Sequence, residues 1–303
     1  MQTLPAVQDC CSPCASSSSE VSVPVLDLNI ESEDGNIIIE WANLITPESI
    51  EIWRSIDGSA FSLMDTIDGN IGTLTDEALM ASGEERCYEV RSVSGALQSA
   101  FSNIVCAVND MIYPGTTPSE PFWLLAFGDF ASDDGTLVTS LSFPALKRVT
   151  GNLFVDATLV LASANFDALQ IVNKGIYFSL SNLASISLPS LEQIDGGPPV
   201  LVQYNGITPE MMIPAFYCDQ SVNLTAISLP NLVFENGKIY AFDSCALSVA
   251  SVEHILARML ASNPSHMFAT LDGGTNAGYA SISALGKSNY DLLVANGNSV
   301  SIN

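Results

Sequence analysis

The sequence has few positive charges. Its 303 residues include nine Lys and Arg against 33 Asp and Glu, which gives a formal net charge of −24. A nucleic-acid-binding domain needs a dense basic patch to release counterions from phosphates, so we exclude nucleic acid as a partner. The same charge disfavours attraction to anionic membranes or polymers. Acidic residues are present at ordinary frequency, so the imbalance comes from the scarcity of cations.

Long apolar runs and catalytic motifs are also missing. The longest apolar stretch, 122–127, is far shorter than the roughly 18–20 residues of a membrane-spanning helix, so we expect no membrane insertion. No Gly-x-Ser-x-Gly motif occurs, and no phosphate-binding glycine loop follows a predicted strand. The two histidines, His254 and His266, have no recognisable catalytic partner, and we interpret His254 as part of a solvated helix face. We therefore predict a protein that is not an enzyme and carries no cofactor.

Cysteines are concentrated near the N-terminus, before the serine run 16–19, which is typical of a flexible spacer. Three close thiolates can ligate a soft metal, but no fourth ligand lies nearby. Disulfides, including bonds between chains, and a peptide that orders only in an assembly are the alternatives. We predict that residues 1–20 form a docking arm without a bound metal, and that its attachment residues are Cys10, Cys11, Pro13 and Cys14.

From residue 21 onward, short segments of β-forming residues alternate with turn signals, which is typical of a β-sandwich. We predict strands at 37–44, 50–64, 73–79, 87–94 and 99–108. The order of these segments, with Trp41 in an early strand, an aromatic-Arg-Ser strand and Asp-Gly hairpin at 53–58, and Tyr88 opening a late strand, resembles the fibronectin type III family. The resemblance implies a sandwich at 21–110 with Trp41, Tyr88 and Val90 in its core. A proline-rich linker follows at 111–121.

Two cysteines in the sandwich are candidates for a cross-strand disulfide. If the last two strands form a hairpin about 95–98, opposite residues have numbers that add up to 193, as Cys87 and Cys106 do. With Tyr88 and Val90 pointing inward, Cys87 lies on the outer face of the sandwich. The alternative is two unpaired thiols, which a register slip of one residue would produce. The acidic pairs, among them Asp76-Glu77, fall in predicted turns and are interpreted as solvated loops.

The remainder of the sequence repeats itself. Apolar sets recur at offsets of 23, 22 and 41 residues: Val138, Phe143, Leu146, Val149; Leu161, Phe166, Leu169, Val172; Leu183, Leu188, Leu191, Ile194; and Leu224, Leu229, Leu232. A glycine-marked turn and a short strand follow each set, at 151–157, 175–180, 198–204 and 237–242. A period of 20–25 residues with recurring strands indicates a solenoid, whose coils bury their apolar faces against each other. The offset of 41 predicts a degenerate coil near 200–216.

This repeat resembles leucine-rich-repeat and receptor-L-like β-solenoids. It departs from the common leucine-rich signature because no asparagine recurs at the ladder position, whereas a proline recurs two residues before a leucine, at Pro144, Pro189 and Pro230. We assign the solenoid to 122–247 and treat Cys218 and Cys245 as buried core thiols. Its predicted core includes Leu161, Leu169, Leu183, Leu191, Leu224 and Leu232.

A solenoid needs a cap over its terminal coil. Residues 248–262 place apolar side chains on one helix face, and a strand at 267–271, a second helix at about 281–295 and a last strand at 299–302 follow. We predict an α/β cap at 248–303. The fold class is therefore mainly β, with a fibronectin-III-like β-sandwich, a leucine-rich-repeat-like β-solenoid and an α/β C-terminal cap.

These features predict a structural or binding protein. The N-terminus lacks the basic and apolar regions of a secretory signal, although the body resembles outward-facing phage structural and bacterial surface proteins. We expect a phage virion component, such as a capsid decoration protein, head fibre or tail-associated adhesin, bound to capsid or tail proteins in many copies and meeting a host glycan or protein. The alternatives are an extracellular or cell-surface adhesin, or a polysaccharide-acting enzyme with the sandwich as an accessory module.

Overall fold

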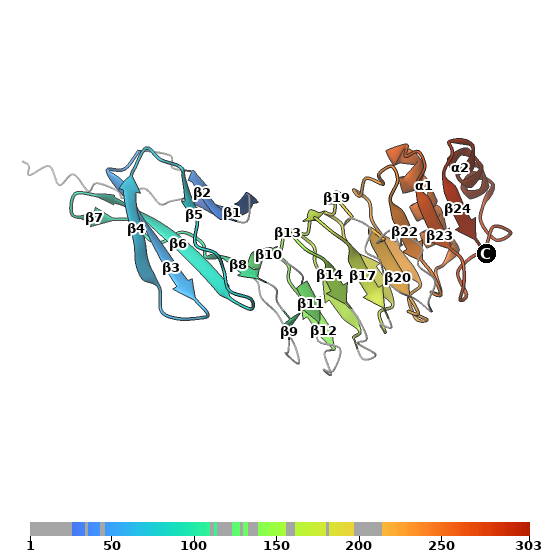
Figure 1. The fold of residues 1–303 in the computed structure, drawn as a ribbon, viewed down its shortest axis with the longest axis horizontal. Coiled ribbons are helices and arrows are strands. Elements are labelled where there is room, and N and C mark those ends of the chain that lie inside the picture. Colours follow the sequence, from blue (N-terminus) through green and yellow to red (C-terminus); the bar gives the residue numbers. More distant parts are fainter. Residues whose placement is uncertain are drawn as a thin grey trace, which may run out of the picture.

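The computed structural model describes residues 26–33, 36–42, 46–109, 112–113, 123–127, 130–132, 139–155, 161–179, 182–196 and 214–303. Strands dominate it, and the described part contains two helices, which confirms the predicted mainly-β class (Figure 1). No helix of the described residues is long and apolar enough to cross a membrane. The docking arm predicted at 1–20 lies outside the described residues.

The first part of the chain is a two-layered sandwich. One layer has the strand order β1-β2-β5, and the other contains β4-β3-β6-β8, with the short β7 paired to β6. The bounds are β1 Leu26–Glu33, β2 Asn36–Ala42, β3 Ser49–Ile56, β4 Ser62–Asp68, β5 Thr73–Asp76, β6 Glu85–Ser94, β7 Leu97–Gln98 and β8 Val105–Asn109. The predicted strand at 99–108 is shorter in the structure, since β8 begins at Val105 and its residues 105–108 lie in register with β6.

Alternation along the strands builds the sandwich core. Residues of β6 alternate between intermediate and full burial, as expected for a strand with one face on the core. Trp41 is 6% exposed, and Tyr88 and Val90 are fully buried, so all three predicted core residues lie in the core. Their neighbours in this cluster include Ile37, Ile39, Ile50, Ile52 and Val105.

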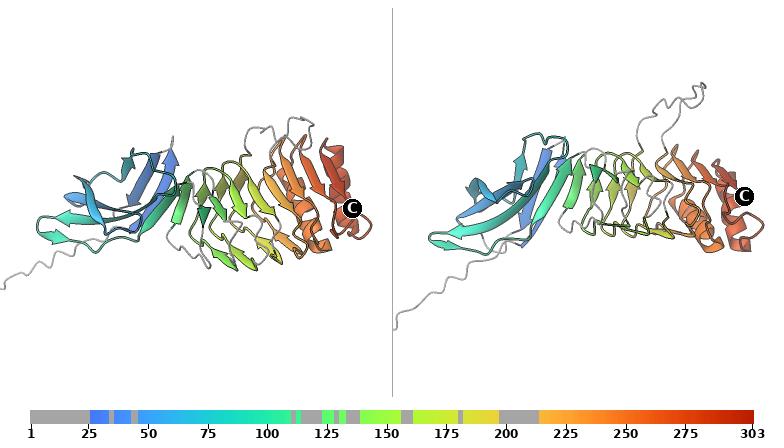
Figure 2. Two further views of the ribbon diagram at one scale, coloured as in Figure 1. Left: turned by 60° about the horizontal axis from the view of Figure 1, so that its bottom comes forward. Right: turned by 90° about the horizontal axis from the view of Figure 1, so that it is seen from below.

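One sheet joins the sandwich to the solenoid. Strand β10 (Trp123–Phe127) pairs in parallel with β8 on one side and with β13 (Arg148–Val149) on the other. The resulting bridging sheet has the order β19-β16-β13-β10-β8-β6-β3-β4, so hydrogen-bonded strands run from one module into the other (Figure 2). The proline-rich sequence predicts only a linker here. Residues Ile112–Tyr113 of that linker form β9, which pairs with β11 (Phe130–Ser132).

Strand β8 contributes side chains to both hydrophobic cores. Val105 and Ala107 pack in the sandwich core, whereas Cys106 and Val108 pack in the solenoid core. All four are buried, because successive side chains of a strand point to opposite faces and both faces are covered here. The two modules therefore share a strand as well as a sheet, which restricts movement of one against the other.

The solenoid has three short strands per coil. Strands β13, β16 and β19 extend the bridging sheet, and β14, β17 and β20 belong to an eight-stranded parallel sheet. The third side consists of the pairs β12–β15 and β18–β21. The bounds are β12 Ser140–Ser142, β14 Leu153–Val155, β15 Ser163–Asn165, β16 Ile171–Val172, β17 Ile176–Ser179, β18 Ser185–Ser187, β19 Gln193–Ile194, β20 Phe216–Asp219 and β21 Ala226–Ser228.

The repeat offsets read from the sequence are the strand registers of the structure. Ser140 lies opposite Ser163, Ile171 lies opposite Gln193, and Ser185 lies opposite Ala226. The six predicted repeat-core leucines are all fully buried. Val138 of the first set and the predicted strand 198–204 lie outside the described residues.

The degenerate coil predicted near 200–216 is wrong. Strand β17 pairs directly with β20, and β18 pairs directly with β21, so no coil separates them in either sheet. Phe216, the end of the predicted coil, is itself the first residue of β20. The 41-residue offset therefore reflects an insertion between two adjacent coils, not an additional coil.

The eight-stranded sheet continues to the C-terminus. Strand β22 (Ile239–Phe242) pairs with β23 (Phe268–Leu271), which pairs with β24 (Ser299–Ile302), all in parallel. Helices α1 (Val249–Ser262) and α2 (Ala284–Ala295) connect these strands, so the predicted cap consists of strand-and-helix coils on the same sheet. Ser248 and Ser283 cap the helices by accepting from backbone N–H groups.

Candidate functional site

Cys87 and Cys106 form a disulfide in the register that the sequence predicts. They lie directly opposite each other on β6 and β8, with Cα atoms 4.1 Å apart, close to the spacing of a narrow antiparallel pair. Cys106 is buried among the first residues of the solenoid core. The disulfide therefore lies on the outer face of the sandwich, where the two modules meet.

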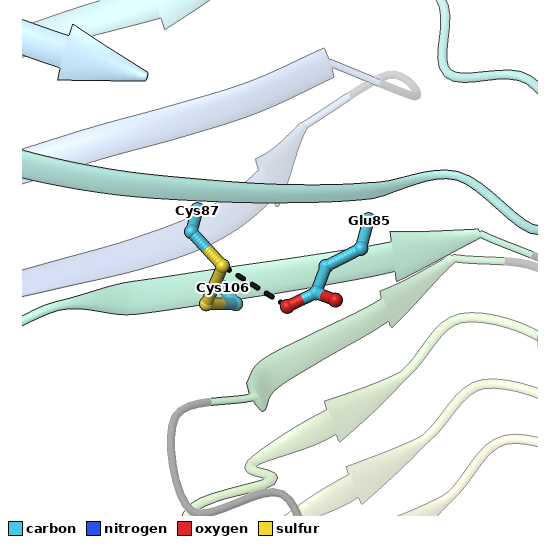
Figure 3. Close-up of side chains that lie close together, drawn as sticks. All are labelled: Glu85, Cys87 and Cys106. Carbon is cyan, nitrogen blue, oxygen red and sulfur yellow. Dashed lines mark hydrogen bonds between the residues drawn. A yellow bond between two sulfur atoms is a disulfide. The ribbon is translucent and has the colours of Figure 1, made fainter. Parts of the chain in front are cut away.

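A carboxylate lies beside this disulfide. Glu85 Oε1 is 3.0 Å from the Cys87 sulfur, and Glu85, Cys87 and Cys106 form the one group of three metal-ligand side chains that the described residues bring together (Figure 3). A sulfur in a disulfide has no thiolate charge, and thiolate is the form that binds metals. The oxidised trio therefore does not provide a metal site.

The acidic residue Asp76 is buried, so its interpretation as part of a solvated loop is wrong. It is 3% exposed and accepts hydrogen bonds from Tyr88 Oη at 2.7 Å, from Arg54 Nη1 at 2.8 Å and from Arg86 Nη1 at 3.2 Å. Burial acts to raise the pKa of Asp76, but the hydrogen bonds from Tyr88 and Arg54 outweigh it and the pKa is lowered. This network stabilises the sandwich and offers no open site.

The most distinctive surface lies on the eight-stranded sheet. Phe154, Tyr177 and Tyr217 are opposite one another on β14, β17 and β20, and we call them the aromatic row. Their strand neighbours point into the solenoid core, so these three side chains point outward and are partly exposed. The rings of Phe154 and Tyr177 stack with centroids 4.8 Å apart, and Tyr217 follows at 6.2 Å.

A glycine makes room for the central ring. A Cβ atom at Gly175 would lie 2.7 Å from the Tyr177 ring and 2.9 Å from the carbonyl oxygen of Pro214. The Tyr177 hydroxyl reaches that same carbonyl at 3.4 Å. Any larger residue at position 175 would therefore displace the ring, which fixes Tyr177 along the strand next to its aromatic neighbours.

Carboxylates lie at the C-terminal ends of three neighbouring strands of the same sheet. Asp219 ends β20, while Asp243 and Asp272 directly follow β22 and β23, and we call these three the acidic row. Tyr217 Oη donates to Asp219 at 3.0 Å, which links the two rows, and Ser301 donates to Asp272. Burial raises the pKa of Asp243, and the negative charges of Asp272 and Asp219 add to the effect. The acidic row is thus held together despite its own repulsion.

A cleft occurs where the sandwich meets the solenoid. It has a volume of about 160 Å³ and is lined by residues that include Asn29, Leu125, Lys147, Arg148 and Gln170. Lys147 Nζ binds the Asn29 side chain at 2.9 Å, and Arg148 Nε binds Asn173 at 3.0 Å. These hydrogen bonds connect β1 to the solenoid and successive coils to each other, so the cleft residues reinforce the junction.

His254, interpreted as part of a solvated helix face, is only partly exposed. Its Nε2 accepts a hydrogen bond from the Leu229 backbone N–H at 3.1 Å, which ties α1 to the coil below. Burial lowers the pKa of His254, and the nearby Arg258 charge adds to this. The histidine therefore has a structural role, as a hydrogen-bond acceptor between α1 and the neighbouring coil. The signal that was missed is its place three residues after the buried Ser251, on the same helix face.

The structure brings Cys218 and Cys245 together, which the sequence analysis did not foresee. Both are buried, as expected, and their sulfur atoms are 3.5 Å apart. The attachment residues predicted in the arm, Cys10, Cys11, Pro13 and Cys14, lie outside the described residues.

Comparisons with known proteins find only coarse likeness. No family model and no curated protein matches. An Fn3-like protein from Clostridium thermocellum is 19% identical, with a TM-score of 0.25, over 28% of this chain and 90% of that chain. A β-1,2-glucanase from Parabacteroides distasonis is 26% identical, with a TM-score of 0.26, over 30% of this chain and 13% of that chain.

A pectate lyase from Pectobacterium carotovorum is 12% identical, with a TM-score of 0.23, over 84% of this chain and 78% of that chain. No family model and no curated protein supports the leucine-rich-repeat subfamily for the solenoid.

Proposed function

We propose that this chain is a non-enzymatic structural and binding protein, which holds a ligand-binding solenoid at a fixed angle to a sandwich stalk. The observation that carries the proposal is the bridging sheet, in which β8 and β10 join the two modules by strand pairing. An enzyme with an accessory module needs only a flexible linker between its two modules. A strand shared by both modules suits a protein that transmits position or force.

The setting we propose is a phage virion, with the arm residues 1–20 docked on a capsid or tail protein and many copies present on one particle. The Cys87–Cys106 disulfide supports a setting outside the reducing cytosol, because such bonds persist in oxidising surroundings. An extracellular or cell-surface adhesin would meet the same condition. The leucine-rich-repeat or receptor-L-like subfamily of the solenoid is part of this proposal.

The binding surface we propose is formed by the aromatic row and the adjacent acidic row. An apolar strip beside a line of carboxylate acceptors suits a neutral glycan, whose C–H faces pack on aromatic rings and whose hydroxyls donate to carboxylates. The net charge of −24 works against a polyanionic ligand. Burial and, after it, the neighbouring negative charges raise the pKa of Asp243, and carboxyl groups perturbed in this way are concentrated at functional sites.

An array of neutral oligosaccharides tests this surface. We expect the double variant Tyr177→Ala/Tyr217→Ala to lose binding by at least about tenfold, because stacked rings each contribute on the order of 1 kcal/mol. Phe268→Ala is the matched control, since Phe268 is 47% exposed on β23 of the same sheet but outside the aromatic row. Equal loss in both variants, with both folded by circular dichroism, would remove the aromatic row from the proposal.

The second candidate function is a polysaccharide-acting enzyme, and one observation favours it. A carboxyl group with a raised pKa beside other carboxylates is the arrangement of a general acid, and Asp243 lies in such a row. Reducing-end release from neutral polysaccharides, abolished in Asp243→Asn, would establish this function. If no product forms while oligosaccharides bind, the binding proposal holds.

A further inference from the structure

Two thiols of neighbouring coils meet inside the solenoid. Cys218 lies on β20 opposite Phe242 of β22, and Cys245 follows β22 by three residues. Their sulfur atoms are 3.5 Å apart, and the Cys245 sulfur is 3.7 Å from the Cys218 carbonyl oxygen. Both residues are at most 1% exposed.

The separation is short enough for a bond. A disulfide needs its sulfur atoms at about 2.05 Å, so the two sulfurs must approach by roughly 1.5 Å, which small side-chain rotations provide. Phe216 and Phe242 stack close by with centroids 5.1 Å apart, and the Cys245 thiol donates to the Asp243 carbonyl oxygen at 3.2 Å. No metal-ligand group of three among the described residues includes either cysteine.

We propose that Cys218 and Cys245 form a second disulfide, closing one solenoid coil onto the next, when the chain folds in the presence of a small-molecule disulfide such as oxidised glutathione. One thiolate attacks the glutathione disulfide and releases one glutathione thiol. The other cysteine then attacks this mixed disulfide and releases the second. The two protein thiols are oxidised, the glutathione disulfide is reduced, and the protein loses two hydrogen atoms.

Burial determines when the bond forms. The pKa of Cys218 is raised by its contact with Cys245 and by burial, so little thiolate exists in the folded core. The reagent also has no path to a fully buried sulfur. Oxidation therefore occurs before the coils close or during local opening, and once formed the bond is equally shielded from reductants.

The bond would staple the solenoid near its C-terminal end. Each coil of a solenoid packs only against its neighbours, so coils can open locally without disturbing distant ones. A bond that closes a loop of 27 residues restricts this opening. The stapled coils are those that carry Tyr217 and Asp243, so the same bond would fix the edge between the aromatic and acidic rows.

A tryptic map under non-reducing conditions tests the proposal directly. Lys and Arg are so placed that each cysteine after residue 86 lies on its own tryptic peptide: Cys87 on 87–91, Cys106 on 92–147, Cys218 on 175–238 and Cys245 on 239–258. The full chain is refolded with glutathione redox buffer, free thiols are blocked with N-ethylmaleimide in denaturant, and the peptides are weighed. We expect 175–238 linked to 239–258 and separated by reductant, with the complex about 2 Da lighter than its parts.

The first disulfide is the internal control. If 87–91 is linked to 92–147 while both 175–238 and 239–258 carry N-ethylmaleimide, the proposal is overturned. Cys218→Ala/Cys245→Ala provides a second readout. The wild-type chain with the Cys218–Cys245 bond should melt about 5–10 °C above the chain without it. Oxidation should raise the melting temperature by the same amount in Cys87→Ala/Cys106→Ala, and should have no such effect in Cys218→Ala/Cys245→Ala. A melting difference that the double variant retains would also contradict the proposal.

Discussion

At the scale of single residues, Asp76 organises the sandwich interior. Its carboxylate compensates Arg86, which is 4% exposed and also donates to the backbone carbonyl oxygens of Ala78 and Leu79. Glu84 also pairs with Arg86, at 2.5 Å, so removing the Asp76 charge leaves this buried guanidinium with one carboxylate instead of two.

We predict that Asp76→Asn lowers the free energy of unfolding by about 1.5–3 kcal/mol at neutral pH, because the charge-assisted hydrogen bonds from Tyr88, Arg54 and Arg86 are weakened. Chemical denaturation checks this. Glu77→Gln is the matched control because Glu77 is the next residue and is exposed, so it should change stability by less than about 0.5 kcal/mol. Similar losses in the two variants would contradict the buried network.

His254 gives a prediction on pH. Its folded pKa lies below the ordinary 6.5, so the unfolded chain takes up a proton first as the pH falls through that value. Its contribution to stability is therefore present above about pH 6.5 and is lost as the pH falls towards the folded pKa.

In His254→Gln, an uncharged acceptor replaces the ring nitrogen, and the fall in unfolding free energy between about pH 7 and pH 5 should become shallower. Denaturation at a series of pH values measures this slope. His266→Asn is the control because His266 is exposed and has a positive φ of 57°, which Asn tolerates. An unchanged slope in His254→Gln would exclude His254 as the titrating group.

At this scale, residues that follow the alternation of a strand could be predicted from the sequence. Residues whose role depends on partners in other strands could not. Trp41, Tyr88 and Val90 follow the strand alternation and lie in the core. Asp76 looked like a turn residue because its partners Arg54 and Arg86 come from other strands. The aromatic row did leave a signal, since Phe154, Tyr177 and Tyr217 occupy one phase of the repeat.

At the scale of elements, the Cys87–Cys106 disulfide cross-links the paired strands β6 and β8. The two cysteines are 19 residues apart, and a cross-link over a loop of this size restricts the unfolded chain. We predict that Cys87→Ala/Cys106→Ala lowers the free energy of unfolding by about 3 kcal/mol under oxidising conditions. Under strong reductant the two proteins should be of similar stability, and a persistent gap would show that the loss comes from packing.

The coils could be predicted from their leucines because each strand register repeats the sequence offset. The offset of 41 residues misled the count, because spacing alone does not show that the strands on either side pair directly, as β18 and β21 do. The bridging sheet was missed for another reason. The run 105–108 is apolar at every position, which is typical of a strand covered on both faces, but its second neighbour β10 lies before the first aligned repeat set, so the repeat pattern does not reveal the pairing.

At the scale of the whole molecule, the shared strand β8 makes one body of two modules. We predict that small-angle X-ray scattering of the full chain fits a single sandwich-to-solenoid orientation for the described residues. A hinge at the junction would require breaking the β8–β10 pairing and exposing both cores at Cys106 and Leu125. Scattering that demands a broad range of orientations would contradict the shared-sheet account.

A cryo-EM map of the material in which the chain naturally occurs tests the central claim most directly. The account predicts many copies at symmetry-related positions on a larger particle, each attached near its N-terminus, with the aromatic and acidic rows facing outward. Chains found only as free monomers, with no density on any assembly, would contradict it.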